Sequence, residues 1–210
     1  MERRELIKMI AALTGGAFIG GGLLTGCKSE PEIGGAVFNN DDIAFLDEVA
    51  ETILPATKSP GAKAAKVGDL MKVMVNDTYE EKDQRLFHKG ISQLNEACNK
   101  MHGHGFMKAT PEQRTALLVA LDKEAKDIQA QRRKAEEDFK KSDAPKGNSL
   151  PIIEFKNPVE PHYFTMMKQL TLLGFFTSKE GATQALRYIP VPGKYIGDYP
   201  YKKGDKAWAT

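Results

Sequence analysis

The stretch NNDDIAFLDEVAETILP at residues 39–55 decides the fold of this chain. Asn39 or Asn40 can cap a helix here, because an asparagine side chain accepts a hydrogen bond from a free backbone N–H of the first turn. Pro55 ends the helix. Between these limits the apolar residues recur every three or four positions, as on one face of an α-helix: Ile43, Leu46, Val49, Ala50, Ile53 and Leu54. The stretch therefore predicts an amphipathic helix with one buried face.

More helical segments follow toward the C-terminus. Residues 69–76 form a second short apolar segment, and from Glu80 apolar residues recur at helical spacing through Leu86, Ile91, Leu94, Cys98 and Met101. Thr110-Pro111-Glu112-Gln113 begins a long helix, because it supplies a capping hydroxyl, a proline at the first helical position and a reaching glutamine at the third. The second half of that helix, at residues 129–141, is mostly charged, so we expect it to project into solvent or to fray.

The last third of the chain combines a loop, two helices and an irregular end. Four prolines between residues 142 and 161 predict a surface loop that opens a new helix near His162. We expect Gly174 to close this helix and Ser178 to cap a short one after it. The expected buried face of the first of these helices is formed by Phe164, Met167, Leu170 and Leu173. The sequence thus predicts an all-α fold of about five to six helices, with a long irregular C-terminal segment rich in Pro, Gly and Tyr.

Composition excludes several classes of function. The chain has 210 residues with 30 Lys+Arg against 28 Asp+Glu, and this net charge of +2 is too small to coat nucleic acid. Only two cysteines occur, Cys27 and Cys98, so a disulfide framework, a cysteine-rich zinc module and a cysteine-ligated iron–sulfur cluster are excluded. Without a Cys-x-x-Cys-His run, covalently attached c-type haem is excluded as well.

The N-terminal segment has the layout of a bacterial export signal. Arg3 and Arg4 precede an uncharged stretch at residues 9–24, which resembles a twin-arginine leader. An ordinary secretory signal that holds two arginines by chance is the alternative. The uncharged stretch is shorter than the roughly 20 apolar residues of a spanning helix. It ends in Leu24-Thr25-Gly26-Cys27, which resembles a lipobox in which the Cys27 thiol accepts the lipid.

These features divide the chain into a signal peptide at 1–26, a tether at 27–38 and a helical domain at 39–210. Acyl chains on Cys27 would bury enough methylene groups to anchor the protein stably. We therefore expect a lipid-anchored protein on the periplasmic side of a bacterial membrane. The residues after Cys27 leave open which membrane, inner or outer, holds the anchor.

Nothing in the chain announces a catalytic centre. His102 and His104 lie in one glycine-rich turn, with His88 on the preceding segment, and three imidazoles are a conceivable set of zinc or copper ligands. A flexible turn with no further ligand favours solvated side chains instead. Cys98 lies on an apolar face, so we expect a buried, inert thiol. P-loop, nucleophile-elbow and H-E-x-x-H motifs are absent from the sequence. We expect no catalytic, cofactor-binding or metal-binding residue in this chain.

Glu48 and Glu51 are a candidate pair of catalytic carboxylates, because paired carboxylates perform acid–base chemistry when burial separates their pKa values. Both lie off the apolar face of their helix. A solvated helix face is the favoured interpretation, although Glu51 lies beside the Pro55 turn and is also placed to cap or bridge to the loop.

The C-terminal segment is the most unusual part of the sequence. Its aromatic residues gather around three prolines: Phe175, Phe176, Tyr188, Tyr195, Tyr199 and Tyr201. Basic residues, among them Arg187, outnumber the acidic ones there. Rigid aromatic side chains on a proline-stiffened backbone are common in protein interfaces, because they lose little entropy on docking. An arm that wraps its own domain would need the same residues, so the sequence leaves both hypotheses open.

Several motifs resemble one known family. They are the twin-arginine leader, the segment FLDEVAETILP at 45–55, the helix start at 110–113, and above all GFFTSKEGAT at 174–183 with YIPVPG at 188–193. Together they resemble the gluconate 2-dehydrogenase subunit 3 family. The resemblance implies a small accessory subunit found with a large FAD-dependent flavoprotein of the glucose–methanol–choline oxidoreductase type. That flavoprotein oxidises sugars or sugar acids, sometimes with a cytochrome as third subunit.

The resemblance implies a partner rather than an active site in this chain, with FAD held by the flavoprotein. The export signal would then serve both proteins, and the small subunit would anchor and stabilise the flavoprotein. Two other hypotheses stand beside it. The chain is a stand-alone helical envelope lipoprotein that acts as a scaffold or ligand binder, or it is itself an enzyme that uses the histidine turn and a metal.

Overall fold

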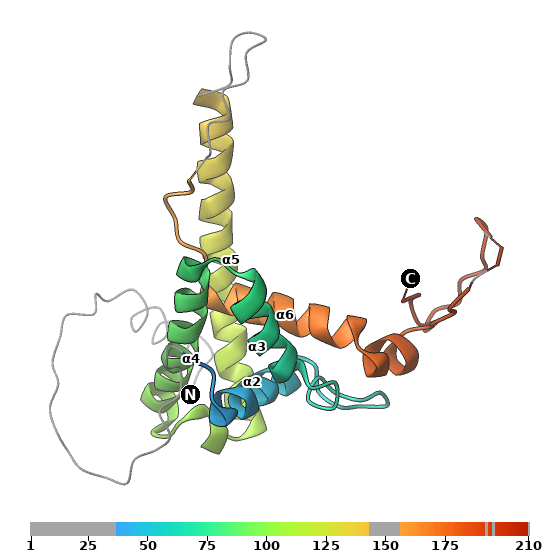
Figure 1. Cartoon of the computed structure of the whole chain (residues 1–210), viewed down its shortest axis with the longest axis horizontal. Helices are drawn as coiled ribbons and strands as arrows, with labels where there is room; N and C mark the ends of the chain where they lie inside the picture. Colours follow the sequence, from blue (N-terminus) through green and yellow to red (C-terminus); the bar gives the residue numbers. More distant parts are fainter. Residues whose placement is uncertain (1–36, 143–155, 192, 195, 210) are drawn as a thin grey trace, which may run out of the picture.

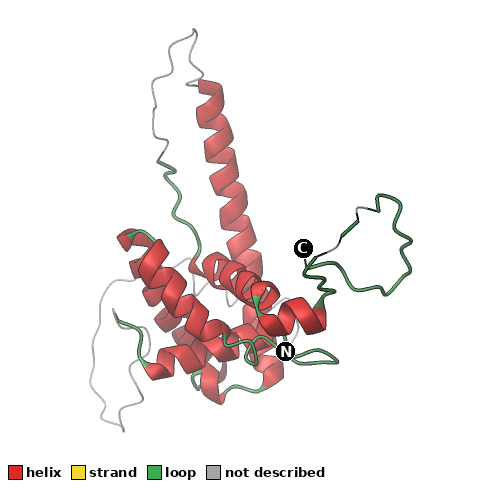
Figure 2. Cartoon of the chain, turned by 45° about the vertical axis from the view of Figure 1, so that its right-hand side comes forward, coloured by secondary structure: helices red, strands yellow, loops and turns green. Residues whose placement is uncertain are grey.

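A computed structural model describes residues 37–142, 156–191, 193–194 and 196–209, and over these residues the chain is helical, as predicted (Figure 1, Figure 2). The helices, in chain order, are α2 (Asn40–Ile53), α3 (Val67–Thr78), α4 (Glu81–His102), the 3₁₀ turn η1 (Phe106–Lys108), α5 (Pro111–Ser142), α6 (Tyr163–Thr177) and the π turn η2 (Gly181–Ala185). The predicted signal peptide and all but the end of the predicted tether lie outside the described residues.

Helix α2 begins where the sequence predicted. Asn39 is the cap: its side chain accepts a hydrogen bond of 2.9 Å from the N–H of Asp42, whose carboxylate accepts one of 3.0 Å from the N–H of Asn39. This reciprocal pair satisfies two backbone donors that a helix start leaves free. Leu46, Val49 and Ala50 of the predicted apolar face are fully buried, so the amphipathic pattern predicts the correct face.

Helix α6 is the centre of the domain and packs against α2, α3, α4 and α5 (Figure 1). Its central position explains why its sequence is apolar on most sides. The largest fully buried side chains come from these helices and from η1, and they include Phe45, Phe87, Phe106, Phe164, Leu117 and Met167. One hydrophobic core therefore joins segments that are far apart in the sequence, from Phe38 to Phe175.

The predicted end of α6 at Gly174 is wrong, and so is the predicted burial of Leu173. The helix continues to Thr177, and Leu173 is 46 % exposed. Gly174 is a packing residue: a Cβ atom there would lie 2.6 Å from the end of the Leu70 side chain on α3, so a larger residue would require Leu70 to shift. The cost of a glycine inside a helix is offset by that contact.

Helix α5 starts with the predicted capping box. The Gln113 side chain accepts a hydrogen bond of 2.9 Å from the Thr110 N–H, and the Thr110 hydroxyl accepts one of 3.4 Å from the Gln113 N–H. The charged second half stands out from the domain as a continuous helix (Figure 1), so it projects rather than frays. The Asn157 side chain, which donates a hydrogen bond of 3.0 Å to the Arg132 carbonyl, fastens the returning chain to it.

Candidate partner-binding surface

The second half of α6 has one buried and one exposed face. Gly174 and Phe175 face the core, whereas an apolar stripe on the opposite side is open to solvent and consists of Leu172, Leu173 and Phe176. Phe175 was expected in a partner interface, but only 4 % of it is exposed, so it belongs to the core. Its ring supports Phe176 edge-on at 5.2 Å between centroids. The exposed stripe therefore rests on a rigid base.

Ser178 redirects the chain at the end of α6. Its hydroxyl donates a hydrogen bond of 2.7 Å to the Phe175 carbonyl and accepts one of 3.0 Å from the Gly181 N–H, so the predicted cap at Ser178 is confirmed. Gly181 itself is tightly enclosed, because a Cβ atom there would meet the Phe175 carbonyl oxygen at 1.9 Å. The π turn η2 follows and fixes the direction in which the chain leaves the domain.

The described residues from 186 to 209, here called the C-terminal arm, extend away from the helical domain (Figure 1, Figure 2). The arm does not wrap the domain, which removes the second hypothesis for this segment. Its large apolar side chains are exposed at Tyr188, Ile189, Val191, Ile196, Tyr199, Tyr201 and Trp208, with Val191 at 80 % and Tyr201 at 74 %. Tyr195 lies outside the described residues.

The two ends of the arm meet. The Arg187 N–H donates a hydrogen bond of 2.8 Å to the Ala207 carbonyl, and the Ala209 N–H donates one of 2.8 Å to the Arg187 carbonyl. Together these bonds form a parallel bridge between Arg187 and Trp208. The arm is thus a closed loop rather than a free tail.

Two aromatic rings contact the Arg187 guanidinium. The guanidinium lies 4.5 Å from the centre of the Trp208 ring system and 5.4 Å from that of Tyr199, and the two rings meet edge to face at 5.8 Å. Such cation–π contacts are attractive because the ring faces are electronegative. Sequence reasoning missed Trp208, although its being the single tryptophan of the chain is a sign that could have singled it out.

The arm is basic as well as aromatic. Arg187, Lys194, Lys202, Lys203 and Lys206 stand against Asp198 and Asp205. The Lys206 ammonium group donates a hydrogen bond to the Gln184 carbonyl of η2. This bond joins the last part of the arm to the turn from which the arm starts. An exposed basic surface with aromatic side chains fits a protein partner with acidic groups around apolar pockets.

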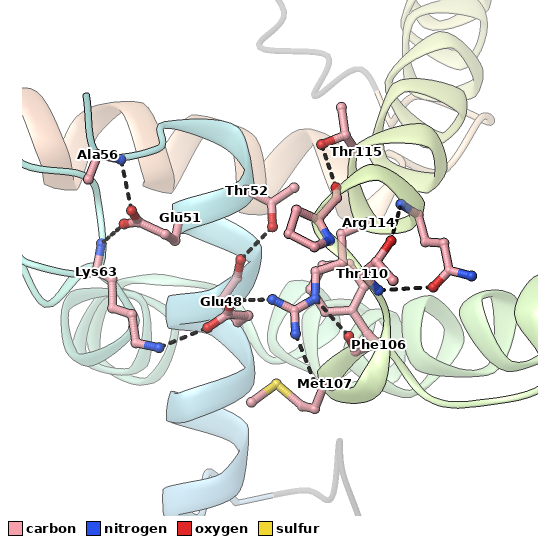
Figure 3. A network of polar contacts seen from close by, with 12 residues as sticks. Glu48, Glu51, Thr52, Ala56, Lys63, Phe106, Met107, Thr110, Arg114 and Thr115 are labelled. Atoms are coloured by element: carbon pink, nitrogen blue, oxygen red, sulfur yellow. Dashed lines mark hydrogen bonds and ion pairs between the residues drawn. The ribbon is translucent and has the colours of Figure 1, made fainter.

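The Glu48 and Glu51 carboxylates are structural, and the expectation of a solvated face is wrong for Glu48 (Figure 3). Glu48 is mostly buried and pairs with Lys63 at 2.8 Å and with Arg114 of α5. Burial raises the pKa of Glu48, but the two cations outweigh it and hold the pKa below its usual value. The carboxylate therefore stays ionised and joins α2 to α5.

Glu51 takes the bridging role that was named as its alternative. Its two carboxylate oxygens accept hydrogen bonds of 2.8 Å from the Ala56 N–H and 2.9 Å from the Lys63 N–H (Figure 3). These bonds hold the loop between α2 and α3 in place, which is a structural role for Glu51. The carboxylates of this helix are thus accounted for by the fold.

The geometry around His102, His104 and Cys98 bears on metal binding and on thiol reactivity. The His102 and His104 rings stack 6.1 Å apart, and burial, together with His104, lowers the pKa of His102. Cys98 is fully buried, as predicted, and burial raises the pKa of its thiol. Within the described residues no three His, Cys, Asp or Glu side chains are grouped to hold a metal ion.

A second histidine environment was not predicted. His162 is buried at the start of α6, where its Nδ1 accepts a hydrogen bond of 3.2 Å from the Phe164 N–H and so caps the helix. Its Nε2 lies 3.8 Å from a carboxylate oxygen of Glu124 on α5. Burial lowers the pKa of His162 to about 4. The side chain is therefore a neutral cap at neutral pH, beside a cleft of about 370 Å³ between α4, α5 and α6.

Comparison with known proteins defines the class of this helical chain. Residues 40–193 match the family described as gluconate 2-dehydrogenase subunit 3, so the match includes the helices α2 to α6, both short turns η1 and η2, and the first part of the arm. The chain belongs to this family and is an accessory subunit of a dehydrogenase complex by that membership. No curated protein matches the chain, and no solved structure matches it.

The lengths and compositions of the helices also bear on membrane crossing. Among the residues it describes, none of the helices combines the length and the apolar character needed to cross a bilayer. Arg3, Arg4 and Cys27, on which the predicted export and lipidation depend, lie outside these residues.

Proposed function

We propose that this protein is the non-catalytic small subunit of a periplasmic, membrane-associated, FAD-dependent dehydrogenase of the glucose–methanol–choline type. Family membership supports the dehydrogenase complex. The observation that carries the subunit role is the C-terminal arm, because it is a closed loop that exposes many large apolar side chains, and apolar surface gains free energy when it is removed from water. Docking on the flavoprotein would bury those side chains.

The partner supplies the redox chemistry in this proposal. FAD and the sugar or sugar-acid site belong to the flavoprotein, and a cytochrome subunit is a further member of the complex. A small subunit that binds only the folded flavoprotein stabilises it by mass action, by about 2.7 kcal/mol at a hundred times the dissociation constant. Export in the folded, FAD-loaded state through the Arg3-Arg4 leader, followed by anchoring at Cys27, completes the role.

The test of the subunit role is isolation of the complex from native membranes. The tagged protein should purify with a flavoprotein in equal amounts, with bound FAD and sugar-dependent reduction of an artificial acceptor. Recovery of the tagged protein alone, from cells shown to contain the flavoprotein, would contradict the proposal.

Export and anchoring are tested separately. Replacing Arg3 and Arg4 by lysine keeps the charge but removes the twin-arginine feature, so both this protein and the flavoprotein should stay in the cytoplasm. Cys27→Ala should release the protein from membranes after a carbonate wash. Normal export of the flavoprotein beside the double lysine variant would refute the shared signal, and full retention of Cys27→Ala would refute the lipid anchor.

A further inference from the structure

The C-terminal arm is held shut by a small set of contacts that all involve Arg187 or its neighbours in space. Arg187 contributes its backbone N–H and carbonyl to the bridge with residues 207–209, and its guanidinium to the rings of Tyr199 and Trp208. One residue thereby fixes both the start and the end of a loop of about twenty residues.

The guanidinium is bound by the rings more than by polar groups. Its Nε is buried and makes no hydrogen bond within the described residues, and its Nη1 donates a long hydrogen bond of 3.4 Å to the Tyr199 hydroxyl. Lysine cannot replace this arrangement, because an ammonium group lacks the planar surface that stacks on an aromatic ring. The position therefore requires arginine for its shape as well as its charge.

The contacts of Arg187 with residues 207–209 and with the rings of Tyr199 and Trp208 are here called the latch. The latch lies apart from the hydrophobic core. Tyr199 and Trp208 are both partly exposed, and the contacts they make with Arg187 are internal to the arm. Opening the latch would thus free the loop without removing a core contact. Both rings also lie beyond residue 193, where the match to the family ends, so the latch joins a family segment to residues outside it.

We infer that Arg187 is the positioning residue of a preformed docking loop, which presents a basic, aromatic surface to an acidic face of the flavoprotein subunit. This inference rests on the proposed function for the identity of the partner. Charge complementarity supports the acidic face, because five basic side chains of the arm stand against two acidic ones. A closed loop binds more tightly than an open one, since the entropy of ordering it is lost before the partner arrives.

The single tryptophan makes the latch directly observable. Trp208 is the single tryptophan of the chain, so all tryptophan fluorescence of the isolated protein comes from the arm. The anisotropy decay of this fluorescence therefore reports the motion of the loop. In the wild type Trp208 should rotate with the whole protein. In Arg187→Gln a fast local component on the nanosecond scale should appear, while the melting temperature of the helical domain stays unchanged.

Affinity for the purified flavoprotein is then measured for the same proteins. Arg187→Gln should weaken binding by about tenfold or more, and Arg187→Lys, which keeps the charge, should fall between it and the wild type. Lys203→Gln is the matched control: it removes one positive charge of the arm, leaves the latch residues in place, and should weaken binding by less than about threefold at physiological salt.

Each result decides a different statement. A Trp208 that moves no faster in Arg187→Gln than in the wild type would overturn the latch. Faster motion with an affinity equal to that of Lys203→Gln would overturn the preformed docking loop. A wild-type protein that does not bind the flavoprotein would refute the proposed function and the docking role together, and the anisotropy of the isolated protein would still decide the latch.

Discussion

The helical domain and the C-terminal arm use the same kinds of side chain in opposite ways. In the domain, phenylalanines such as Phe45 and Phe106 are fully buried and pack ring to ring at 5.3 Å. In the arm, Tyr188, Tyr199 and Tyr201 are exposed, and the described polar contacts close the arm on itself or on η2. The domain is thus stabilised by its own core, whereas the arm is closed by polar contacts and leaves its large apolar side chains exposed to solvent.

The largest contrast should appear when one aromatic residue is removed from each region. Phe45→Ala should destabilise the domain by about 3–5 kcal/mol, because it deletes a buried ring and leaves a cavity. Tyr201→Ala, in the arm, should change stability by less than about 0.5 kcal/mol. Denaturant unfolding followed by circular dichroism measures both. Similar losses for the two variants would show that the arm belongs to the cooperative unit of the domain.

Acid should act on the domain through His162. The folded state lowers the pKa of this residue from 6.5 to about 4, because burial disfavours the charged imidazolium. The unfolded state then binds more protons between these values, so the stability is fully present above pH 6.5 and is lost as the pH falls toward 4. The difference corresponds to about 3 kcal/mol.

This pH dependence is measured by the midpoint of denaturant unfolding between pH 4 and pH 7. His162→Asn is the control, because an asparagine side chain can cap a helix without titrating in this range. It should flatten the curve over that interval. An unchanged slope in His162→Asn would assign the acid sensitivity to other groups.

Buried and exposed ion pairs within the domain should differ next. Arg114→Met removes the pairing with Glu48 together with hydrogen bonds of 2.9 Å to the carbonyls of Phe106 and Met107, and should cost about 2–3 kcal/mol. Lys123→Met breaks a pair with Asp127 that is open to solvent, and should cost less than about 0.5 kcal/mol. Thermal and denaturant unfolding measure the loss of stability in each variant. Equal losses for Arg114→Met and Lys123→Met would contradict the bridging role of Glu48.

The smallest effect, and one confined to binding, is expected for the exposed stripe of α6. Phe176→Ala should weaken binding to the flavoprotein by about 2 kcal/mol, because an aromatic anchor in an interface often contributes this much. Its effect on stability should be small, since the ring is 39 % exposed. Met107→Ala in η1, at 42 % exposure, is the matched control and should leave the affinity unchanged. Calorimetry of both variants against the flavoprotein compares them.

Local patterns predicted the helices well. The Asn39 cap and the Thr110 capping box depend on residues three positions apart, so the sequence displays them directly. The continuation of α6 past Gly174 was not predicted, because glycine marks helix ends in a sequence, whereas this glycine packs against Leu70 of another helix. The pairing of Glu48 with Arg114 was missed for the same reason, since these residues are 66 positions apart.

The candidate surface was predicted in part. Neighbouring residues such as Phe175 and Phe176 have the same chemistry but opposite burial, and only the register of α6 against the core distinguishes them. Arg187 was singled out for its charge, whereas its contact with Trp208 depends on a backbone bridge between distant positions. Composition thus indicates an interface, and the fold decides which side chains present it.

Removal of the arm tests the central claim most directly. A chain that ends at Leu186 keeps every described helix and loses the whole basic, aromatic loop. We expect its melting temperature to stay within about 3 °C of the full-length value, and its affinity for the flavoprotein to fall by about a hundredfold or more. A truncated protein that binds the flavoprotein as tightly as the full chain would contradict the account.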